Sequence, residues 1–204
     1  MRKLIVLTFV SLDGVMQAPG GPQEDTSGDF TQGGWSVGYW DDTLAQTMGE
    51  QMGHPFELLL GRKTYDVFES AWPQIDPSNP INSSKKYVVT HHPIPAATEI
   101  WKNSIRIDGD VAEKIKQLKQ ENGPELQVHG SSNLIQTLIA HDLVDEFWLK
   151  IYPVTLGKGK RLFGEGAFPA GFKLKECKSS PSGVIIASYV RDGTVKIGSF
   201  EVPN

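Results

Sequence analysis

The sequence predicts an α/β fold built on a mostly parallel, twisted β-sheet whose C-terminal strands run antiparallel. Up to residue 152, short apolar, β-rich runs alternate with stretches of helical periodicity, which is typical of βαβ units. The junctions between these runs are short, which favours right-handed parallel crossovers. Beyond residue 171, turn signals join the predicted strands without room for helices, so we expect an antiparallel edge.

The predicted elements follow one another closely. The first strand, at residues 3–10, is almost continuously apolar, as in a strand covered on both faces. Asp41 and Asp42 provide an N-cap and first-turn acids for a helix that reaches Met52. Trp72-Pro73 is expected to end the helix that starts at Lys63. The remaining predicted elements are strands at 56–60, 87–90, 105–107, 125–128, 146–152, 172–177, 184–190 and 194–197, and helices at 63–69, 110–121 and from 134 to near 141.

Residues 11–39 form a long glycine-rich segment between the first strand and the first helix. A structureless loop of this length is usually either functional or disordered. Aromatic residues punctuate it, namely Phe30, Trp35 and Tyr39, with Trp40 directly after it. We therefore interpret it as a mobile lid that packs over a ligand; the alternative is a flexible insertion.

Composition limits the function classes. The chain has 204 residues, which fits one domain spanning residues 1–204. A formal net charge of −4 leaves no broad positive field for nucleic acid or anionic lipid. The N-terminal apolar run is too short to span a bilayer and has no cleavage site. With Cys177 as the single cysteine, we expect a cytoplasmic protein for a small-molecule substrate, without a thiolate metal site.

Two strand-to-helix junctions have the pattern of a phosphate-binding site. The apolar strand at 58–60 stops at Gly61 and turns directly into Arg62-Lys63-Thr64. The strand at 126–128 leads in the same way into His129-Gly130-Ser131-Ser132-Asn133 and a helix. A helix N-terminus presents unpaired N–H groups and positive charge, and glycine lets a ligand approach the backbone. Two such junctions suit a dinucleotide better than a single phosphate.

Asp13 is the best candidate for acid or base chemistry, because it ends a buried strand at the mouth of the predicted lid. A partly desolvated carboxyl group there would have a raised pKa and could hold a proton near neutrality. The alternative is a turn residue in Asp13-Gly14. Asp41 and Asp42 are second candidates, although helix capping also explains them. His91, His92 and His129 lack a further ligand at fixed spacing, so we predict no metal site.

Taken together, these residues resemble the dihydrofolate reductase superfamily, and specifically the reductase domain of bacterial riboflavin biosynthesis. The resemblance spans nearly the whole chain. It depends on the shared order of Ser11-Leu12-Asp13-Gly14, Leu60-Gly61-Arg62-Lys63-Thr64-Tyr65, His129-Gly130-Ser131, Leu143-Val144-Asp145-Glu146 and the run from Ile151 to Gly157. The resemblance implies a three-layer fold with about eight strands and helices on both faces. It also implies NADPH as cofactor and a homodimer.

The resemblance assigns roles to individual residues. Arg62, Lys63 and Thr64 would hold cofactor phosphates, Thr90 and His91 would lie near the adenosine ribose and its phosphate, and the glycine turn would hold the pyrophosphate. The peptide before Gly130 would be a candidate for a non-proline cis bond. Asp13 would be catalytic and would bind substrate together with Trp40 and Tyr152. The full cofactor set is Gly61, Arg62, Lys63, Thr64, Thr90, His91, Val128, Gly130, Ser131, Ser132, Asn133 and Leu134.

The implied function is an NADPH-dependent reductase similar to 5-amino-6-(5-phosphoribosylamino)uracil reductase, acting on a pterin- or ribosylaminopyrimidine-like substrate. Two departures bear on it. The glycine run of the folate enzymes is reduced to Gly130, and the deaminase motifs His-x-Glu and Pro-Cys-x-x-Cys that usually accompany the riboflavin reductase are absent. The alternatives are a module that binds NADPH or a nucleotide without catalysis, and a true dihydrofolate reductase using Asp41 or Asp42.

Overall fold

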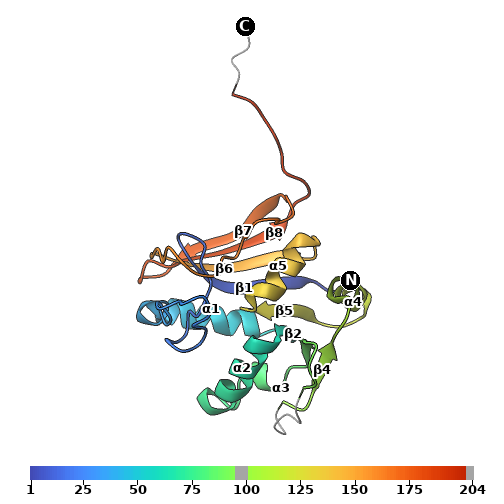
Figure 1. The fold of residues 1–204 in the computed structure, drawn as a ribbon. Coiled ribbons are helices and arrows are strands. Elements are labelled where there is room, and N and C mark those ends of the chain that lie inside the picture. Colours follow the sequence, from blue (N-terminus) through green and yellow to red (C-terminus); the bar gives the residue numbers. More distant parts are fainter. Residues whose placement is uncertain (95–100, 201–204) are drawn as a thin grey trace.

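The computed structural model describes residues 1–94 and 101–200. Figure 1 shows a twisted central sheet of eight strands with helices on both faces. The elements are β1 (Leu4–Ser11), η1 (Val37–Tyr39), α1 (Asp42–Met52), β2 (Phe56–Gly61), α2 (Arg62–Ile75), α3 (Pro80–Ser83), β3 (Lys86–Val89), β4 (Ser104–Ile107), α4 (Val111–Gln120), β5 (Glu125–His129), α5 (Ser132–Ala140), β6 (Glu146–Tyr152), β7 (Phe172–Ser179) and β8 (Ile185–Arg191).

The sheet has the strand order β4-β3-β2-β5-β1-β6-β8-β7. Strands β1 to β6 are paired in parallel, whereas β8 pairs antiparallel with both β6 and β7. The predicted mostly parallel sheet with antiparallel C-terminal strands is therefore confirmed. Strand β5 lies between β1 and β2, so the carboxyl ends of these three strands meet at the same edge.

The sheet separates two apolar layers, as the predicted three-layer fold requires. On one face, α4 and α5 pack with residues such as Ile115 and Leu138 against Val6 and Val128. On the other face, α1, α2 and α3 cover alternate residues of the same strands, with Tyr65 among the buried side chains. The near-continuous apolar sequence of β1 follows from this burial on both faces.

The loop between β1 and α1 is ordered by contacts of its own. Val15, Ala18 and Phe30 form a small buried cluster. The Gln17 side chain donates hydrogen bonds of 2.9 Å to the carbonyl oxygens of Asp25 and Ser27, and the Trp35 indole donates to the carbonyl oxygen of Gln17. The loop is thus not structureless, although the predicted opening and closing motion stays a prediction.

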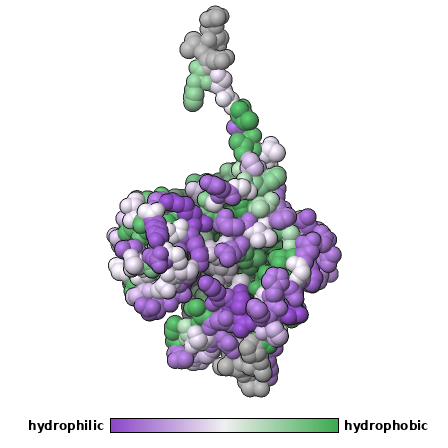
Figure 2. Space-filling view, viewed as in Figure 1, coloured by the Kyte–Doolittle hydropathy of each residue, from purple (hydrophilic) through white to green (hydrophobic). Residues whose placement is uncertain are grey.

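The predicted end of one helix is wrong, and so is one predicted strand. The helix expected to end at Trp72-Pro73 continues to Ile75, because Trp72 packs against Phe68 and this contact outweighs the backbone hydrogen bond that Pro73 is unable to donate. The strand expected at 194–197 does not form. Instead, the segment after Asp192 extends away from the sheet (Figure 1), and Figure 2 shows it as largely apolar. Without a neighbouring strand to pair with, β-rich residues there remain extended coil.

Candidate active site

A cavity of about 710 Å³ opens at the carboxyl ends of the parallel strands. All predicted cofactor-binding residues except Val128 line it, that is residues 61–64, Thr90, His91 and residues 130–134. Val128 is fully buried in the core below, packed among the residues that α4 and α5 cover. The structure therefore brings together in one cavity the two junctions that the sequence places about 70 residues apart.

The two junctions are in direct contact. The backbone N–H of Gly61 donates a 3.0 Å hydrogen bond to Oγ of Ser131. A Cβ on Gly130 would lie 3.8 Å from the Thr64 methyl group, so this turn packs closely against the start of α2. Both Gly130 and Ser131 adopt left-handed backbone conformations, with φ of 59° and 58°. These two consecutive residues make the sharp turn from β5 into α5.

The non-proline cis bond predicted before Gly130 is not present. The described residues contain no cis peptide bond, and the left-handed pair Gly130-Ser131 makes the turn with trans peptides. The single glycine of this turn is sufficient because Ser131 also accepts the left-handed conformation that a second glycine would otherwise supply.

The two helices that start at this cavity are the uncapped ones among the α-helices of the described residues. Side chains of Asp41, Asn79 and Asp110 cap α1, α3 and α4 by accepting backbone hydrogen bonds. No side chain caps α2 or α5, and neither helix has an acidic residue in its first turn. The free N–H groups and the positive dipole ends of both helices thus lie at the cavity, which is the arrangement of an anion-binding site.

Basic side chains flank the start of α2. Arg62 forms an ion pair with Asp66 at 2.7 Å and donates to the carbonyl oxygen of Pro93. His91, which follows β3 beside this junction, hydrogen-bonds to Asp108, which also pairs with Arg106. The structure confirms that Arg62 and His91 lie at one cavity, although each is held by a carboxylate.

The β1–α1 loop forms another wall. Met16, Gln17 and Gly20 line the cavity. Lys160 lines it too and forms an ion pair with Asp25, which connects the loop to the segment after β6. The loop thus lies against the predicted cofactor residues, as the sequence-based interpretation of a covering segment requires.

The raised pKa predicted for Asp13 is wrong. A hydrogen bond from the Ser11 hydroxyl, together with bonds from the backbone N–H groups of Leu156 and Gly157, lowers the pKa of Asp13 to about 2. Asp13 is not among the residues that line the large cavity. Its carboxylate instead ties the end of β1 to the loop after β6, so the turn-residue alternative has the stronger support.

The predicted substrate residues Trp40 and Tyr152 also lie outside the cavity lining. Trp40 is about half exposed on the surface. Tyr152 is fully buried, and its ring packs against Phe9, Trp35 and Tyr39. Tyr152 thus holds the β1–α1 loop against the sheet, since an aromatic cluster of this kind buries a large apolar area.

The base of the cavity, which we call its floor, has polar side chains that the sequence did not lead us to predict. Lys150, in the middle of β6, lines the cavity and is completely buried, and burial lowers its pKa to about 7. His129 lies beside it; burial and then repulsion from Lys150 lower the pKa of His129 to about 3. A lysine that interrupts an otherwise apolar strand was the available signal, because such a charge is rarely buried without a role.

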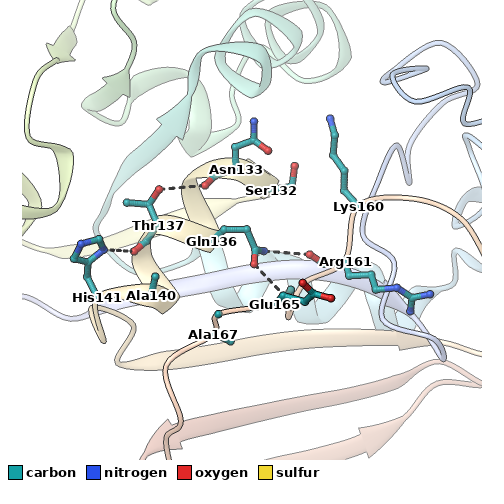
Figure 3. Close-up of a pocket in the computed structure, with 12 residues that line it drawn as sticks. Ser132, Asn133, Gln136, Thr137, Ala140, His141, Lys160, Arg161, Glu165 and Ala167 are labelled. Carbon is teal, nitrogen blue, oxygen red and sulfur yellow. Dashed lines mark hydrogen bonds between the residues drawn. The ribbon is translucent and has the colours of Figure 1, made fainter.

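A second, shallower groove of about 530 Å³ adjoins the cavity along α5 (Figure 3). It shares Ser132, Asn133, Thr137 and Lys160 with the large cavity. Gln136 crosses it, donating to the carbonyl oxygen of Arg161 and accepting from the N–H of Gly164. These bonds fix the segment after β6 against α5, so the groove has a defined wall.

The described residues show neither a membrane-spanning helix nor a metal-binding cluster. No helix there is long and apolar enough to cross a membrane. No group of three or more His, Cys, Asp or Glu side chains in the same residues could hold a metal ion.

Comparison with known proteins identifies the family. Residues 2–186 match the model of the RibD C-terminal domain. The chain belongs to this family. A curated relative, the uncharacterized protein YyaP of Bacillus subtilis (strain 168), is 30% identical over 203 residues, covering 94% of this chain and 96% of the relative. The predicted resemblance to the riboflavin-type reductase domain is therefore confirmed.

Solved structures confirm the dihydrofolate reductase-like fold of this RibD C-terminal domain. A pyrimidine reductase-like protein from Corynebacterium diphtheriae superposes with a TM-score of 0.65 at 15% identity, covering 94% of this chain and 92% of that one. Dihydrofolate reductase from Enterococcus faecalis, in complex with NADP(H), gives a TM-score of 0.57 at 17% identity, with coverage of 93% and 96%.

The contact between the two junctions gives a prediction for Ser131→Ala. The variant leaves the N–H of Gly61 without its acceptor, so we expect a loss of about 1 kcal/mol in the free energy of unfolding, measured by urea denaturation. Ser70→Ala is the matched control, because the Ser70 hydroxyl bonds only within α2. Equal stability of the two variants would contradict the proposed link.

The bonding of Asp13 gives a second prediction. Asp13→Asn should lower the free energy of unfolding at pH 7 by about 1 to 3 kcal/mol, because it loses a charge-assisted acceptor of three hydrogen bonds. The folded-state pKa of about 2 lies below the ordinary aspartate pKa of 3.8, so this stabilisation is present above pH 4 and is lost as the pH falls toward 2. The difference from the unmodified protein should shrink over that range in denaturation experiments. A pH-independent difference would show that the carboxylate charge is not responsible.

Proposed function

We propose that this RibD C-terminal domain is an NADPH-dependent reductase. One observation carries the proposal: the uncapped N-termini of α2 and α5 touch each other through Gly61 and Ser131 and open onto the same cavity. Two adjacent anion sites of this kind fit the linked phosphates of a dinucleotide. Arg62 and Lys63 add positive charge at one side, as the extra phosphate of NADPH requires.

The proposed substrate is a pterin- or ribosylaminopyrimidine-like molecule that accepts hydride at an electrophilic carbon, in a C=N bond or a ring-opened ribosyl group. The support is membership of a family named for riboflavin biosynthesis, together with a likeness in fold to a pyrimidine reductase-like protein. The reaction would be similar to that of 5-amino-6-(5-phosphoribosylamino)uracil reductase.

Different residues of this chain would bind the cofactor and cover the reacting groups. The N–H groups at the starts of α2 and α5 would hold the cofactor phosphates. Met16 and Gln17 of the β1–α1 loop would cover the cavity and exclude water from the reacting groups. When bound, the reduced nicotinamide would supply the hydride; the protein contributes orientation and electrostatics.

The rival proposal is a module that binds NADPH or a nucleotide without catalysis, which the reduced glycine run motivates. Fluorescence titration with NADPH, followed by stopped-flow loss of its absorbance with pterins and ribosylaminopyrimidines, separates the two. Binding with oxidation supports the reductase. Tight binding without oxidation across the panel favours the module, and no binding at millimolar NADPH contradicts both.

A true dihydrofolate reductase has less support from the geometry. Asp41, the acid it would use, accepts hydrogen bonds from the backbone N–H groups of Leu44 and Ser182. Neither Asp41 nor Asp42 lines the cavity. Dihydrofolate turnover that disappeared in Asp41→Asn without loss of the folded state would revive this alternative.

Homodimerisation and a cytoplasmic location stay predictions. We propose the homodimer on the family resemblance, and analytical ultracentrifugation at micromolar concentration tests it. A monomer at all accessible concentrations would contradict it.

The position of Arg62 predicts a change in cofactor preference. Arg62→Ala should weaken NADPH binding about 10- to 100-fold and NADH binding much less, because a guanidinium group pairs best with the additional phosphate. Fluorescence titration with both cofactors measures the two losses.

The matched control is Arg191→Ala, since Arg191 forms a comparable pair with Asp142 but does not line the cavity. This variant should leave both affinities unchanged. Equal losses for NADPH and NADH in Arg62→Ala would count against the assigned position of the extra phosphate.

A further inference from the structure

Lys150 lies at the floor of the cavity on the α1 side of the sheet. Along β6, Phe147 and Leu149 pack into the opposite apolar layer, so Lys150 points the other way. Its strand neighbours are Phe9 of β1 and Ile186 of β8, neither of which can accept a hydrogen bond through its side chain. The lysine is therefore surrounded by apolar groups on both sides within the sheet.

The bonding of Lys150 differs from that of the other buried lysines. An ammonium group has three donors. In the part of the chain that the structure describes, Lys150 donates one hydrogen bond, to Oε1 of Gln51 on α1, and has no carboxylate partner. Lys119, in contrast, pairs with Asp145 at 2.6 Å. Lys86 bonds to Asn82 and Asn103 and lies over the Trp101 ring. Of the three, Lys150 is the one that lines the cavity.

A hydrogen-bonded chain orients the neighbouring histidine. Nε2 of Gln127 donates to the carbonyl oxygen of Gln51 and to the carboxylate of Glu125, so its Oε1 must face His129. Oε1 can only accept, which makes Nε2 of His129 the donor in their 3.0 Å bond. Burial, followed by repulsion from Lys150, lowers the pKa of His129 to about 3, so near pH 7 the ring is neutral and Nδ1 carries no proton to supply.

The remaining ionisable groups that line the cavity lie on other walls. Glu24 and Asp25 belong to the β1–α1 loop, and Asp25 pairs with Lys160. Arg62, Lys63 and His91 lie at the α2 side. The elements packed around Lys150 present Phe9, Met48, Gln51 and Ile186, none of which titrates, and His129. Lys150 is consequently the group at the floor that can carry and release a proton.

We propose that Lys150 is the catalytic proton donor of this domain, a proposal that rests on the reductase function above. Addition of hydride to the carbon of a C=N or C=O bond transfers the π electron pair to the heteroatom. A proton from Nζ of Lys150 forms the new bond to that heteroatom as the Nζ–H bond breaks. Lys150 is left as a neutral amine and regains a proton from water. A proton donor at this position therefore favours substrates in which the carbon that accepts the hydride is double-bonded to nitrogen or oxygen.

The environment of Lys150 suits this role. Burial lowers its pKa to about 7, and a general acid is most effective when its pKa lies near the working pH. The bond to Gln51 holds the amine in place, so Gln51 acts as a positioning residue.

The first test uses the protein without ligands. Lysine labelled with ¹⁵N at Nζ and ¹³C at Cε should show one NMR signal that titrates near pH 7, that is lost in Lys150→Met and that persists in Lys86→Met. Lys86 is the matched control, because it is equally buried but does not line the cavity. A Lys150 signal that titrates near pH 10 overturns the proposal.

Stability provides a second readout without ligand. The folded-state pKa of Lys150 lies below the ordinary lysine pKa of 10.5, so the unfolded chain binds more protons between pH 7 and pH 10. The stability due to this group therefore rises across that window. Lys150→Met should remove this rise and should be more stable than the unmodified protein at pH 7. A variant that shows this stability is folded, so its loss of activity is then not due to unfolding. The absence of a pH-dependent difference contradicts the assignment.

The third test follows single-turnover oxidation of NADPH with the substrate found in the panel. Lys150→Met should slow it about 100-fold or more, while the NADPH dissociation constant changes less than twofold. The rate of the unmodified enzyme should fall as the pH rises above 7, and the variant should lack this decline. A rate within threefold of the unmodified enzyme overturns the proposal.

The outcomes separate failure of this proposal from failure of the proposed function. If the unmodified protein binds no NADPH, the reductase proposal fails. In that case 5,6-diaminouracil serves as probe: a shift of the Lys150 signal, with the Lys86 signal unchanged, retains Lys150 as a ligand-facing group but overturns its role in reduction. If neither signal moves, the floor is not a binding site and the whole inference is wrong.

Discussion

The parallel pairing of β2 with β5 is the constraint on which the site depends. Leu58 lies opposite Gln127, so the two strands end at the same edge and deliver Gly61 and Ser131 into contact. Were β1 inserted between them, the junctions would be separated by a further strand spacing of about 4.8 Å, and one dinucleotide could not use both helix N-termini in the same way. The chain reaches this pairing only by placing β5 between β1 and β2.

Short sequence patterns predicted those parts of the structure that depend mainly on residues close together in the chain. The apolar run of β1, the glycine at the start of α2 and the turn at Gly130 each have a sequence signature, because strand burial and helix entry depend on neighbouring residues. The helix at 63–69 was extended to Ile75 by packing of Trp72, which no local rule contains. The strand at 194–197 failed because a β-strand requires a partner.

The role of Asp13 shows why site chemistry is harder to predict than fold. Position alone suggested a desolvated acid with a raised pKa. Its charge depends first on the nearby Ser11 hydroxyl and then on the N–H groups of Leu156 and Gly157, which are more than 140 residues away along the chain. A carboxylate that accepts several N–H bonds stays ionised even when partly buried. Hydrogen-bond partners, which the sequence does not order in space, therefore determine whether an acid is structural or catalytic.

Hydrogen-bond partners also determine the energetic cost of burying Lys150. A buried lysine without a carboxylate partner destabilises the folded state, because its charged form loses hydration. Replacement by an apolar side chain in β6 would relieve that cost, as Phe9 and Ile186 on either side already offer an apolar surface. Lys119 avoids the cost through Asp145, and Lys86 reduces it through Asn103 and Trp101. Among residues 1–94 and 101–200, Gln51 is the hydrogen-bond partner of Lys150, which otherwise faces the cavity. A ligand that develops negative charge in the cavity would pair with the Lys150 ammonium group, and this interaction would stabilise the reacting state more than the ground state.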